Sequence, residues 1–344
     1  SNHRPLSTKT KKKEGAIMKL GILGTGMIIK DLMTTYSKFD IEKTYLLATT
    51  QTQQEAEELC QKYHLDQIFY DYDQLLDSDI DTVYIALPNH LHYSFAKKAI
   101  LKGKHVIIEK PICANAHELQ DLIDLSHEHH VIILEAMNIH YLPAYQSLKT
   151  HLSKLGQIKI LNFNYSQYSS RYDAFKEGRI LPAFDYHKAG GALMDLNVYN
   201  LHAIIGLMGQ PENQHYFANI EKGIDTSGIM VLEYPHLKAI SIGAKDCKAP
   251  ITSTLQGDQG VIVIDKPMNQ MTEYTFIDNK GHQTKYEFPQ DQHRLYYEFE
   301  EFIRIINEKD FEKAQAMIEL SLQVAQVMEK GRQQEGVIFD NDQQ

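Results

Sequence analysis

The stretch Met18–Asp31, MKLGILGTGMIIKD, decides what fold to expect for the whole chain. A short apolar run closed by glycine is typical of a buried strand that ends in a tight turn. Gly24 and Gly26 follow this strand and precede a predicted helix. That is the context of a dinucleotide-binding loop, because the first glycine makes the turn and the second lets a pyrophosphate approach the backbone. Ile29 stands at the third motif position, where glycine or alanine is usual. A tight turn that binds no ligand is the alternative interpretation.

Further apolar runs follow, separated by segments with helical periodicity. The predicted strands are 44–50, 82–87, 105–109 and 131–136, and the predicted helices are 52–63, 90–104 and 115–130, the last capped by Asn115. These strands lack polar alternation, which is typical of a parallel sheet covered by helices on both faces. The sequence therefore predicts a doubly wound α/β domain of the Rossmann type over residues 18–138.

After Gly156 the pattern changes to strands with few helices between them. Residues 158–170 alternate, several strand-like runs follow, and the segment 278–283, DNKGHQ, is a hairpin signal. A final helix is predicted over 311–330, with an apolar stripe that faces the core and a stop at Gly331. Residues 139–344 are therefore expected to form an α+β domain whose mostly antiparallel sheet has one face covered by helices.

Composition limits the classes of protein that fit. The chain has 344 residues, of which 43% are hydrophobic and 23% charged, values typical of a soluble globular protein. No apolar run approaches the roughly 20 residues of a membrane span, so no membrane partner is expected. Three unpatterned cysteines, Cys60, Cys113 and Cys247, suggest reduced thiols and a cytoplasmic location.

Residues 1–17 form a basic tail with a net charge of +4, from five basic residues and one acidic residue. The tail has no apolar core of a signal peptide. It is either a localisation or nucleic-acid-binding tail, or a cloning remnant ahead of a native Met18, and we favour the remnant. The net charge of the whole chain is −10, so residues 18–344 carry −14. That balance argues against nucleic acid as a partner.

Polar side chains gather where the predicted parallel strands end. Ligands of doubly wound sheets bind outside the carboxyl ends of the strands. Three separate strand ends supply polar groups, which favours a ligand crevice over solvated strand ends. The predicted nucleotide-binding residues are Gly24, Thr25, Gly26, Met27, Ile28, Thr49, Thr50, Leu87, Pro88, Asn89, His92, Glu109, Lys110 and Asn138. The segment 48–52, ATTQT, offers neither an acid for a ribose hydroxyl nor an arginine for a 2′-phosphate, so the sequence does not decide between NAD and NADP. The Lys110–Pro111 bond is a candidate cis bond.

A second constellation lies in Lys188–Pro211, KAGGALMDLNVYNLHAIIGLMGQP. Asp195, Tyr199 and His202 stand at i, i+4 and i+7 of a predicted helix, which places them on one face. They are either a satisfied buried group or an acid/base residue with its orienting carboxylate. His127 and His130 lie one helical turn apart, but no third ligand is evident, so no metal site is predicted.

The motifs GTG, LPN, EKP, EAM and GGALMDLNVYNLH together resemble the glucose–fructose oxidoreductase/inositol dehydrogenase (Gfo/Idh/MocA) family over nearly all of residues 18–340. The resemblance implies a Rossmann domain followed by a domain with a large open sheet, often used for dimer contacts. Lys110 matches the family's catalytic lysine, and Asp195 the aspartate of its GG…D motif. Tyr199 takes the place of its histidine or tyrosine, as in the branch with dihydrodiol dehydrogenase. Asn197 and His202 depart from the family pattern and are expected to reshape the substrate pocket.

The resemblance also implies NAD(P)-dependent hydride transfer at a CH–OH carbon of a sugar, cyclitol or related diol. Tyr199 is expected to exchange the hydroxyl proton, and Lys110 to bind the same oxygen and lower the pKa of the tyrosine from its usual value near 10. Asp195 orients the lysine. Arg171 and Tyr172 are candidate contacts to substrate hydroxyls, with a surface turn as the alternative. A nucleotide-binding sensor and a non-redox NAD-assisted enzyme are the rival functions. A homodimer or homotetramer through the second sheet is expected.

Overall fold

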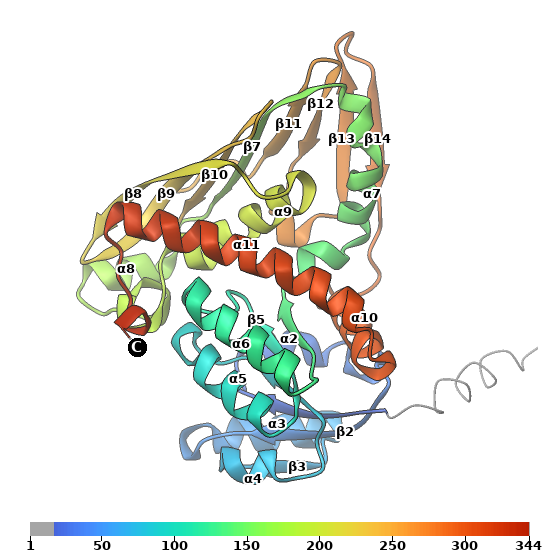
Figure 1. Ribbon diagram of the computed structural model, residues 1–344, viewed down its shortest axis with the longest axis vertical. Coiled ribbons are helices and arrows are strands. Elements are labelled where there is room, and N and C mark those ends of the chain that lie inside the picture. The colour runs from blue at the N-terminus through green and yellow to red at the C-terminus, as the bar shows by residue number, and fades with distance from the viewer. Residues whose placement is uncertain (1–16, 344) are drawn as a thin grey trace, which may run out of the picture.

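This computed structural model describes residues 17–343, so the predicted basic tail lies outside the described residues except for its last position. The chain forms two sheets, drawn below and above helix α11 in Figure 1. The first is parallel, with strand order β3-β2-β1-β4-β5-β6. Its strands are β1 (Met18–Leu23), β2 (Ile41–Leu47), β3 (Gln67–Phe69), β4 (Thr82–Ile85), β5 (His105–Glu109) and β6 (Ile133–Ala136). Its helices are α2 (Met27–Met33), α3 (Gln53–Tyr63), α4 (Tyr72–Leu76), α5 (His92–Leu101) and α6 (Ala116–Glu128). The order reverses between β1 and β4, which is the switch point where such sheets bind ligands.

The second sheet has eight strands in the order β14-β13-β12-β11-β7-β10-β9-β8. They are β7 (Ile158–Ser166), β8 (Asn213–Glu221), β9 (Ile224–Glu233), β10 (Lys238–Ala244), β11 (Ser253–Gly257), β12 (Gly260–Ile264), β13 (Glu273–Asp278) and β14 (Gln283–Glu287). All pairs are antiparallel except β7 with β10. Helices α7 (Pro143–His151), α9 (Val198–Met208) and α11 (Phe311–Glu335) lie on one face (Figure 1). The predicted fold class is confirmed.

Two C-terminal helices also complete the core of the first sheet. Phe299 and Phe302 of α10 (Leu295–Glu308) pack in one buried cluster with Ile22 and Tyr84. Helix α11 contacts α6 and β6 on one side and β8 and α9 on the other. The predicted division at residue 138 therefore separates the two sheets along the chain, but the core beside the first sheet includes residues from both segments.

The predicted helix stop at Gly331 is wrong. Helix α11 continues to Glu335 and ends at Gly336, whose φ of +68° suits a glycine cap. At Gly331 a Cβ atom would lie 2.6 Å from Cε of Met230, so this glycine lets the helix pack closely on the second sheet.

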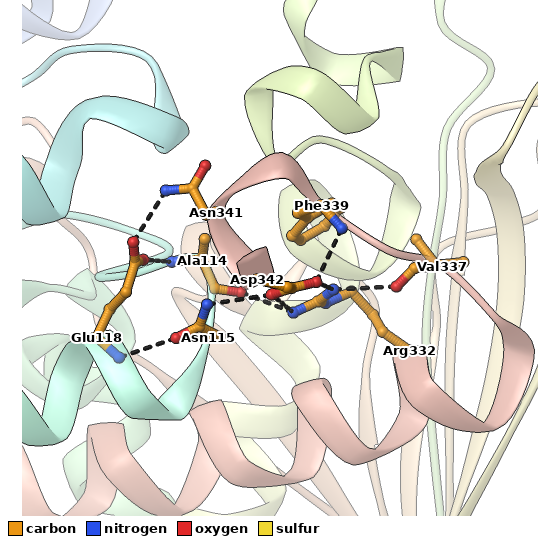
Figure 2. A network of polar contacts seen from close by, with 8 residues as sticks. All are labelled: Ala114, Asn115, Glu118, Arg332, Val337, Phe339, Asn341 and Asp342. Atoms are coloured by element: carbon orange, nitrogen blue, oxygen red, sulfur yellow. Dashed lines mark hydrogen bonds and ion pairs between the residues drawn. The ribbon is translucent and has the colours of Figure 1, made fainter. Parts of the chain in front are cut away.

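Beyond Gly336 the chain returns across α6, where eight residues form a polar cluster that we call the C-terminal network (Figure 2). The guanidinium of Arg332 is 1% exposed and donates to the carbonyl oxygens of Val337 and Ala114, both at 3.0 Å, and to the Asp342 carboxylate at 2.8 Å. Its other members are Asn115, Glu118, Phe339 and Asn341.

The C-terminal network meets the first sheet at two loops that follow its strands. Asn341 donates to the Glu118 carboxylate at 2.9 Å and to the His90 carbonyl at 3.1 Å. Ala114 lies a few residues after β5, and His90 a few residues after β4. The network therefore holds two of the loops that carry predicted site residues. Among residues 17–343, no helix is long and apolar enough to cross a membrane.

Candidate active site

The glycine loop after β1 has the shape that a pyrophosphate requires. Gly24 has a φ of +118°, and a Cβ atom there would lie 2.6 Å from the carbonyl oxygen of Ala86. At Gly26 a Cβ atom would have no neighbour within 4 Å, so the backbone there is open to a bound group. Helix α2 begins directly after this open glycine and has no acidic residue in its first turn. The loop therefore fits an anionic ligand at the helix start.

The other predicted residues around this loop differ in exposure. Met27 is exposed, Ile28 is half-buried, and Thr25 is buried, with its hydroxyl donating to Glu55 at 3.0 Å. Thr49 and Thr50 are exposed at the end of β2. No motif pointed to Glu55, which stands in the first turn of α3.

Two predicted nucleotide contacts are placed inside the protein. Both ring nitrogens of His92 lie 2.8 Å from backbone carbonyl oxygens, those of Leu87 and Pro111, and its side chain is fully buried. Asn138 is 3% exposed and donates its amide to the Asn269 carbonyl at 2.8 Å. A neutral imidazole can donate from only one of these nitrogens. Because the ring is buried between the two carbonyl groups, we propose that His92 joins the loops after β4 and β5 rather than binding the nucleotide.

The loop after β4 reaches the second constellation directly. The half-buried Asn89 donates its amide to the carbonyl of Ala189 at 2.9 Å, one residue before the Gly190–Gly191 pair. Leu87 is half-buried and Pro88 exposed. The predicted strand-end residues and the Gly190–Gly191 segment therefore meet at one edge of the first sheet.

Glu109 ends β5, is half-buried, and lies near the buried carboxyl group of Glu298. The hydroxyl of Tyr84 donates to Glu109 at 2.5 Å. Burial raises the pKa of Glu109 to about 7, although the bond from Tyr84 and the charge of Lys110 oppose this. Glu298 of α10 is fully buried, and its carboxyl oxygens have no hydrogen-bond partner among the described residues. Burial, followed by the charge of Glu109, raises the pKa of Glu298. These two carboxyl groups thus favour their protonated forms.

Lys110 brings the two predicted constellations together. Its ammonium donates to the backbone carbonyl of Asp195 at 2.9 Å, lies 3.6 Å from Oδ1 of the same residue, and stands 4.6 Å from the ring centre of Tyr199. The Lys110–Pro111 bond is cis. Tyr165 stacks on Tyr199 with ring centres 5.9 Å apart. A lysine, an aspartate and a tyrosine from the two halves of the chain therefore share one partly exposed site.

Charges in this site move its pKa values in opposite directions. Burial raises the pKa of Asp195, but Lys110 and Lys245 outweigh it and hold that pKa well below the usual range. Burial lowers the pKa of Lys110, but Tyr199 and Asp195 raise it overall. For Tyr199 burial is the largest effect, so its pKa is raised even though Lys110 lowers it in part. Lys110 therefore lowers the pKa of Tyr199 as expected, but burial outweighs this effect and leaves the pKa above its usual value.

Asp195 does not have the α-helical spacing that we expected. It lies in a π-helical turn, Leu193–Asn197, that leads into α9. A π turn takes in an extra residue, so positions i, i+4 and i+7 no longer form one stripe. Asp195 and Tyr199 still meet at Lys110, whereas His202 is 1% exposed, with Nε2 2.9 Å from Glu135 and Nδ1 3.0 Å from His140.

The four predicted substrate contacts are placed differently from one another. Asn197 is fully buried and donates to the Ser241 carbonyl at 3.0 Å, so, like His202, it belongs to the interior. In α8 (Ser170–Lys176), Arg171 is exposed, and its charge contributes to lowering the pKa of Asp195. The Tyr172 hydroxyl donates to Glu221 at 2.7 Å. Of the four, Arg171 has the placement that suits a substrate contact.

Sequence reasoning missed Lys245, which directly follows β10 (Lys238–Ala244). Its ammonium bonds the Asp195 carboxylate, and its side chain is 4% exposed. No motif surrounds this lysine in the sequence. Among residues 17–343, no group of three His, Cys, Asp or Glu side chains is placed to hold a metal ion.

Comparisons with known proteins agree on the kind of protein that this chain resembles. Residues 18–137 match the family model GFO_IDH_MocA, described as an oxidoreductase family with an NAD-binding Rossmann fold. The chain is 33% identical to the scyllo-inositol 2-dehydrogenase (NADP(+)) IolU of Bacillus subtilis, over 95% of this chain and 100% of that protein. It is 25% identical to the trans-1,2-dihydrobenzene-1,2-diol dehydrogenase of Mus musculus, over 72% of this chain and 75% of that one. A 3-ketoreductase from Actinomadura kijaniata, solved with NADP and TDP-benzene, shares the fold with a TM-score of 0.78 at 17% identity, over 92% of this chain and 98% of that chain.

Proposed function

Because this chain belongs to the Gfo/Idh/MocA family of NAD(P)-dependent oxidoreductases, we propose that it transfers a hydride between the nicotinamide and a CH–OH carbon of a cyclitol, sugar or related diol. The observation that carries the proposal is the meeting of Lys110, Asp195 and Tyr199 at the carboxyl edge of the first sheet. That edge also carries the open glycine loop.

The proposed chemistry divides between the nucleotide and the side chains. A nicotinamide nucleotide held at the loop of Gly24 and Gly26 would supply the hydride acceptor or donor. Tyr199 exchanges a proton with the substrate oxygen, and its raised pKa keeps the phenol protonated, the form that donates a proton to a carbonyl oxygen. The ammonium of Lys110 donates a hydrogen bond to the same oxygen and stabilises negative charge there. Asp195 holds the lysine through its carbonyl and its carboxylate.

We propose NADP as the preferred nucleotide and scyllo-inositol as the first substrate to test. The segment 48–52 at the end of β2 contains no acidic side chain that would repel a 2′-phosphate. The IolU relative is named for both compounds, which supports the choice of probe.

The test mixes the protein with NAD or NADP and with each member of a panel of cyclitols, aldoses and diols. The absorbance of reduced nicotinamide measures the reaction. Lys110→Ala is the control. Reduction that disappears in the control supports the dehydrogenase. If the protein binds NADPH, as shown by the fluorescence of the dinucleotide, but turns over no compound, the result supports the sensor function. Product formation without net nucleotide reduction would instead support the non-redox enzyme.

We also propose that the uncovered face of the second sheet joins copies of this chain, because it carries exposed apolar residues. They are Ile160, Phe217 and Ile229, and a hollow of about 560 Å³ lies between Phe217, Ser227 and Cys247. Exposed sheet faces of this kind mark association surfaces. Light scattering after size exclusion tests this, with Phe217→Glu expected to reduce the mass.

Three free cysteines are consistent with the cytoplasmic location that we propose, to be tested by cell fractionation.

A further inference from the structure

Lys245 is the most deeply buried ammonium group of the candidate active site. It follows the last residue of β10, and its backbone N–H donates to the carbonyl of Thr226 on β9 at 2.9 Å. Its own carbonyl accepts from the N–H of Ser169 at 3.0 Å, at the start of α8. The ammonium stands 5.4 Å from the ring centre of Phe184 and bonds Asp195. Backbone bonds on both sides thus fix where this side chain starts.

Asp195 divides its carboxylate between two lysines. Oδ1 lies 3.6 Å from the Lys110 ammonium, and Oδ2 bonds the Lys245 ammonium. The side chain of Lys245 is 4% exposed, whereas those of Lys110 and Asp195 are 16% and 32% exposed. Two positive charges therefore share one negative charge, and the more exposed ammonium is the one beside Tyr199.

We propose that Lys245 is a positioning residue that neutralises Asp195 and so leaves the charge of Lys110 available to the substrate oxygen and to Tyr199. This rests on the proposed function and deepens it. Without Lys245, Asp195 would have Lys110 as its main counter-charge. The pair would be neutral, and the carboxylate would draw the ammonium away from the reacting oxygen. A carboxylate that needs two cations is otherwise difficult to explain, because burying a second ammonium group costs solvation energy.

The proposal predicts a change in proton affinity that a purely structural lysine would not cause. Lys110, Glu109, Asp195, Tyr165 and Tyr84 are the titratable groups that face Tyr199. All of them remain when Lys245 is replaced. Removing its positive charge makes ionisation of the phenol less favourable, so Tyr199 should release its proton at higher pH.

The experiment compares Lys245→Met, which keeps the length of the side chain but not its charge, with Lys245→Arg, which keeps the charge. Lys104→Met is the matched control, because the Lys104 ammonium donates to the Ile80 carbonyl at the opposite edge of the first sheet. The rate of scyllo-inositol oxidation by NADP is measured from neutral to alkaline pH. For Lys245→Met we expect the acidic limb of the kcat profile to move up by about one pH unit, a roughly tenfold loss at neutral pH. The KM for NADP should stay within about twofold, and Lys245→Arg should restore the wild-type midpoint.

An unchanged midpoint in Lys245→Met, with only a lower melting temperature or a uniform fall in kcat, would overturn the proposal. If the wild type oxidises no compound on the panel, the proposed function fails, but this proposal is still tested without substrate. The ultraviolet absorbance of tyrosinate is then titrated in proteins with and without Tyr199→Phe, and the difference gives the ionisation of Tyr199. A higher midpoint in the Lys245→Met background supports the proposal, and equal midpoints overturn it.

Discussion

Two clusters of buried charge join the first sheet to the second half of the chain, and their charges are balanced differently. In the C-terminal network, one guanidinium meets one carboxylate, and each terminal nitrogen of Arg332 donates twice, to Asp342 and to a backbone carbonyl. In the active site, two ammonium groups share the carboxylate of Asp195, and one of them lies against a tyrosine ring.

The difference suggests how a structural ion pair can be told from a functional one. The Arg332 side chain is 2% exposed, and its terminal nitrogens have no hydrogen left for a ligand. The active site is more exposed and has positive charge in excess, which is what a developing negative charge on a substrate oxygen requires. Breaking the first cluster should therefore cost stability, and breaking the second should cost rate.

The largest expected effect is on rate, from Tyr199→Phe. Loss of the phenol oxygen removes the group that exchanges the substrate proton, so kcat should fall by about 10²–10⁴-fold. The melting temperature should hardly change, because the Tyr165 stacking partner remains. Steady-state kinetics measure kcat, and thermal unfolding measures the melting temperature. Tyr93→Phe is the matched control, since that hydroxyl donates to Asp121 of α6 and does not contact Lys110 or Asp195. A loss of rate below about threefold would remove Tyr199 from the mechanism.

Arg332→Met should have the opposite effect, a loss of stability with little loss of rate. It leaves Asp342 and the carbonyls of Val337 and Ala114 without their donor, and breaking a buried pair in this way costs about 3–5 kcal/mol in the free energy of unfolding. Denaturant unfolding measures the loss, and kcat per folded molecule should stay within about threefold of the wild type. A tenfold lower kcat without loss of stability would contradict the separation of the two clusters.

Glu109 provides a further contrast, because it is a half-buried carboxyl group whose pKa is raised even though Lys110 lies beside it. Its pKa is raised to about 7 in the folded protein from a usual value of 4.5, mainly by burial. Between these two pH values the unfolded chain binds fewer protons than the folded one, so stability falls as the pH rises. Glu109→Gln should remove this part of the fall and stabilise the nucleotide-free protein by about 2 kcal/mol above pH 7 but not near pH 4.5.

The measurement for Glu109→Gln is denaturant unfolding at an acidic and a weakly alkaline pH. Glu128→Gln, at an exposed position of α6, is the control and should show no such difference between the two pH values. Equal stabilisation of Glu109→Gln at both pH values would show that the carboxyl group stays ionised.

Patterns within about ten residues predicted most of the first sheet. The run His105–Glu109 is β5 as predicted, and Asn115 caps α6 by accepting from the Glu118 N–H. The glycine loop lies at an open backbone position, and the EKP motif lies at a polar strand end. Both follow from local sequence, because a strand, a turn and a helix start are local features. The likeness to a known family added the pairing of Lys110 with Asp195 and Tyr199, which no local pattern supplies.

Contacts between distant segments could not be predicted in this way. Arg332 and Ala114 lie 218 positions apart, and Lys245 is 50 positions from Asp195, without a motif at either end. The buried positions of His92, Asn197 and His202 follow from tertiary packing, which local sequence patterns do not predict. The sequence predicts a helix stop at Gly331 because glycine commonly ends helices, and the packing of this glycine against Met230 leaves no trace in the sequence.

The smallest expected effect, from Asn341→Ala, tests whether the C-terminal network influences the active site at all. The change removes the donor to the Glu118 carboxylate and the His90 carbonyl, and should cost about 1–2 kcal/mol in the free energy of unfolding. Because His90 adjoins Asn89, a loosened loop should also weaken NADPH binding by about two- to threefold, measured by the fluorescence of the dinucleotide. Asn279→Ala is the matched control, since that amide donates to the Asp258 carbonyl at an exposed hairpin. Weaker binding in Asn341→Ala alone would show that the network positions the loop after β4, whereas a loss of stability with unchanged binding would confine its role to the fold.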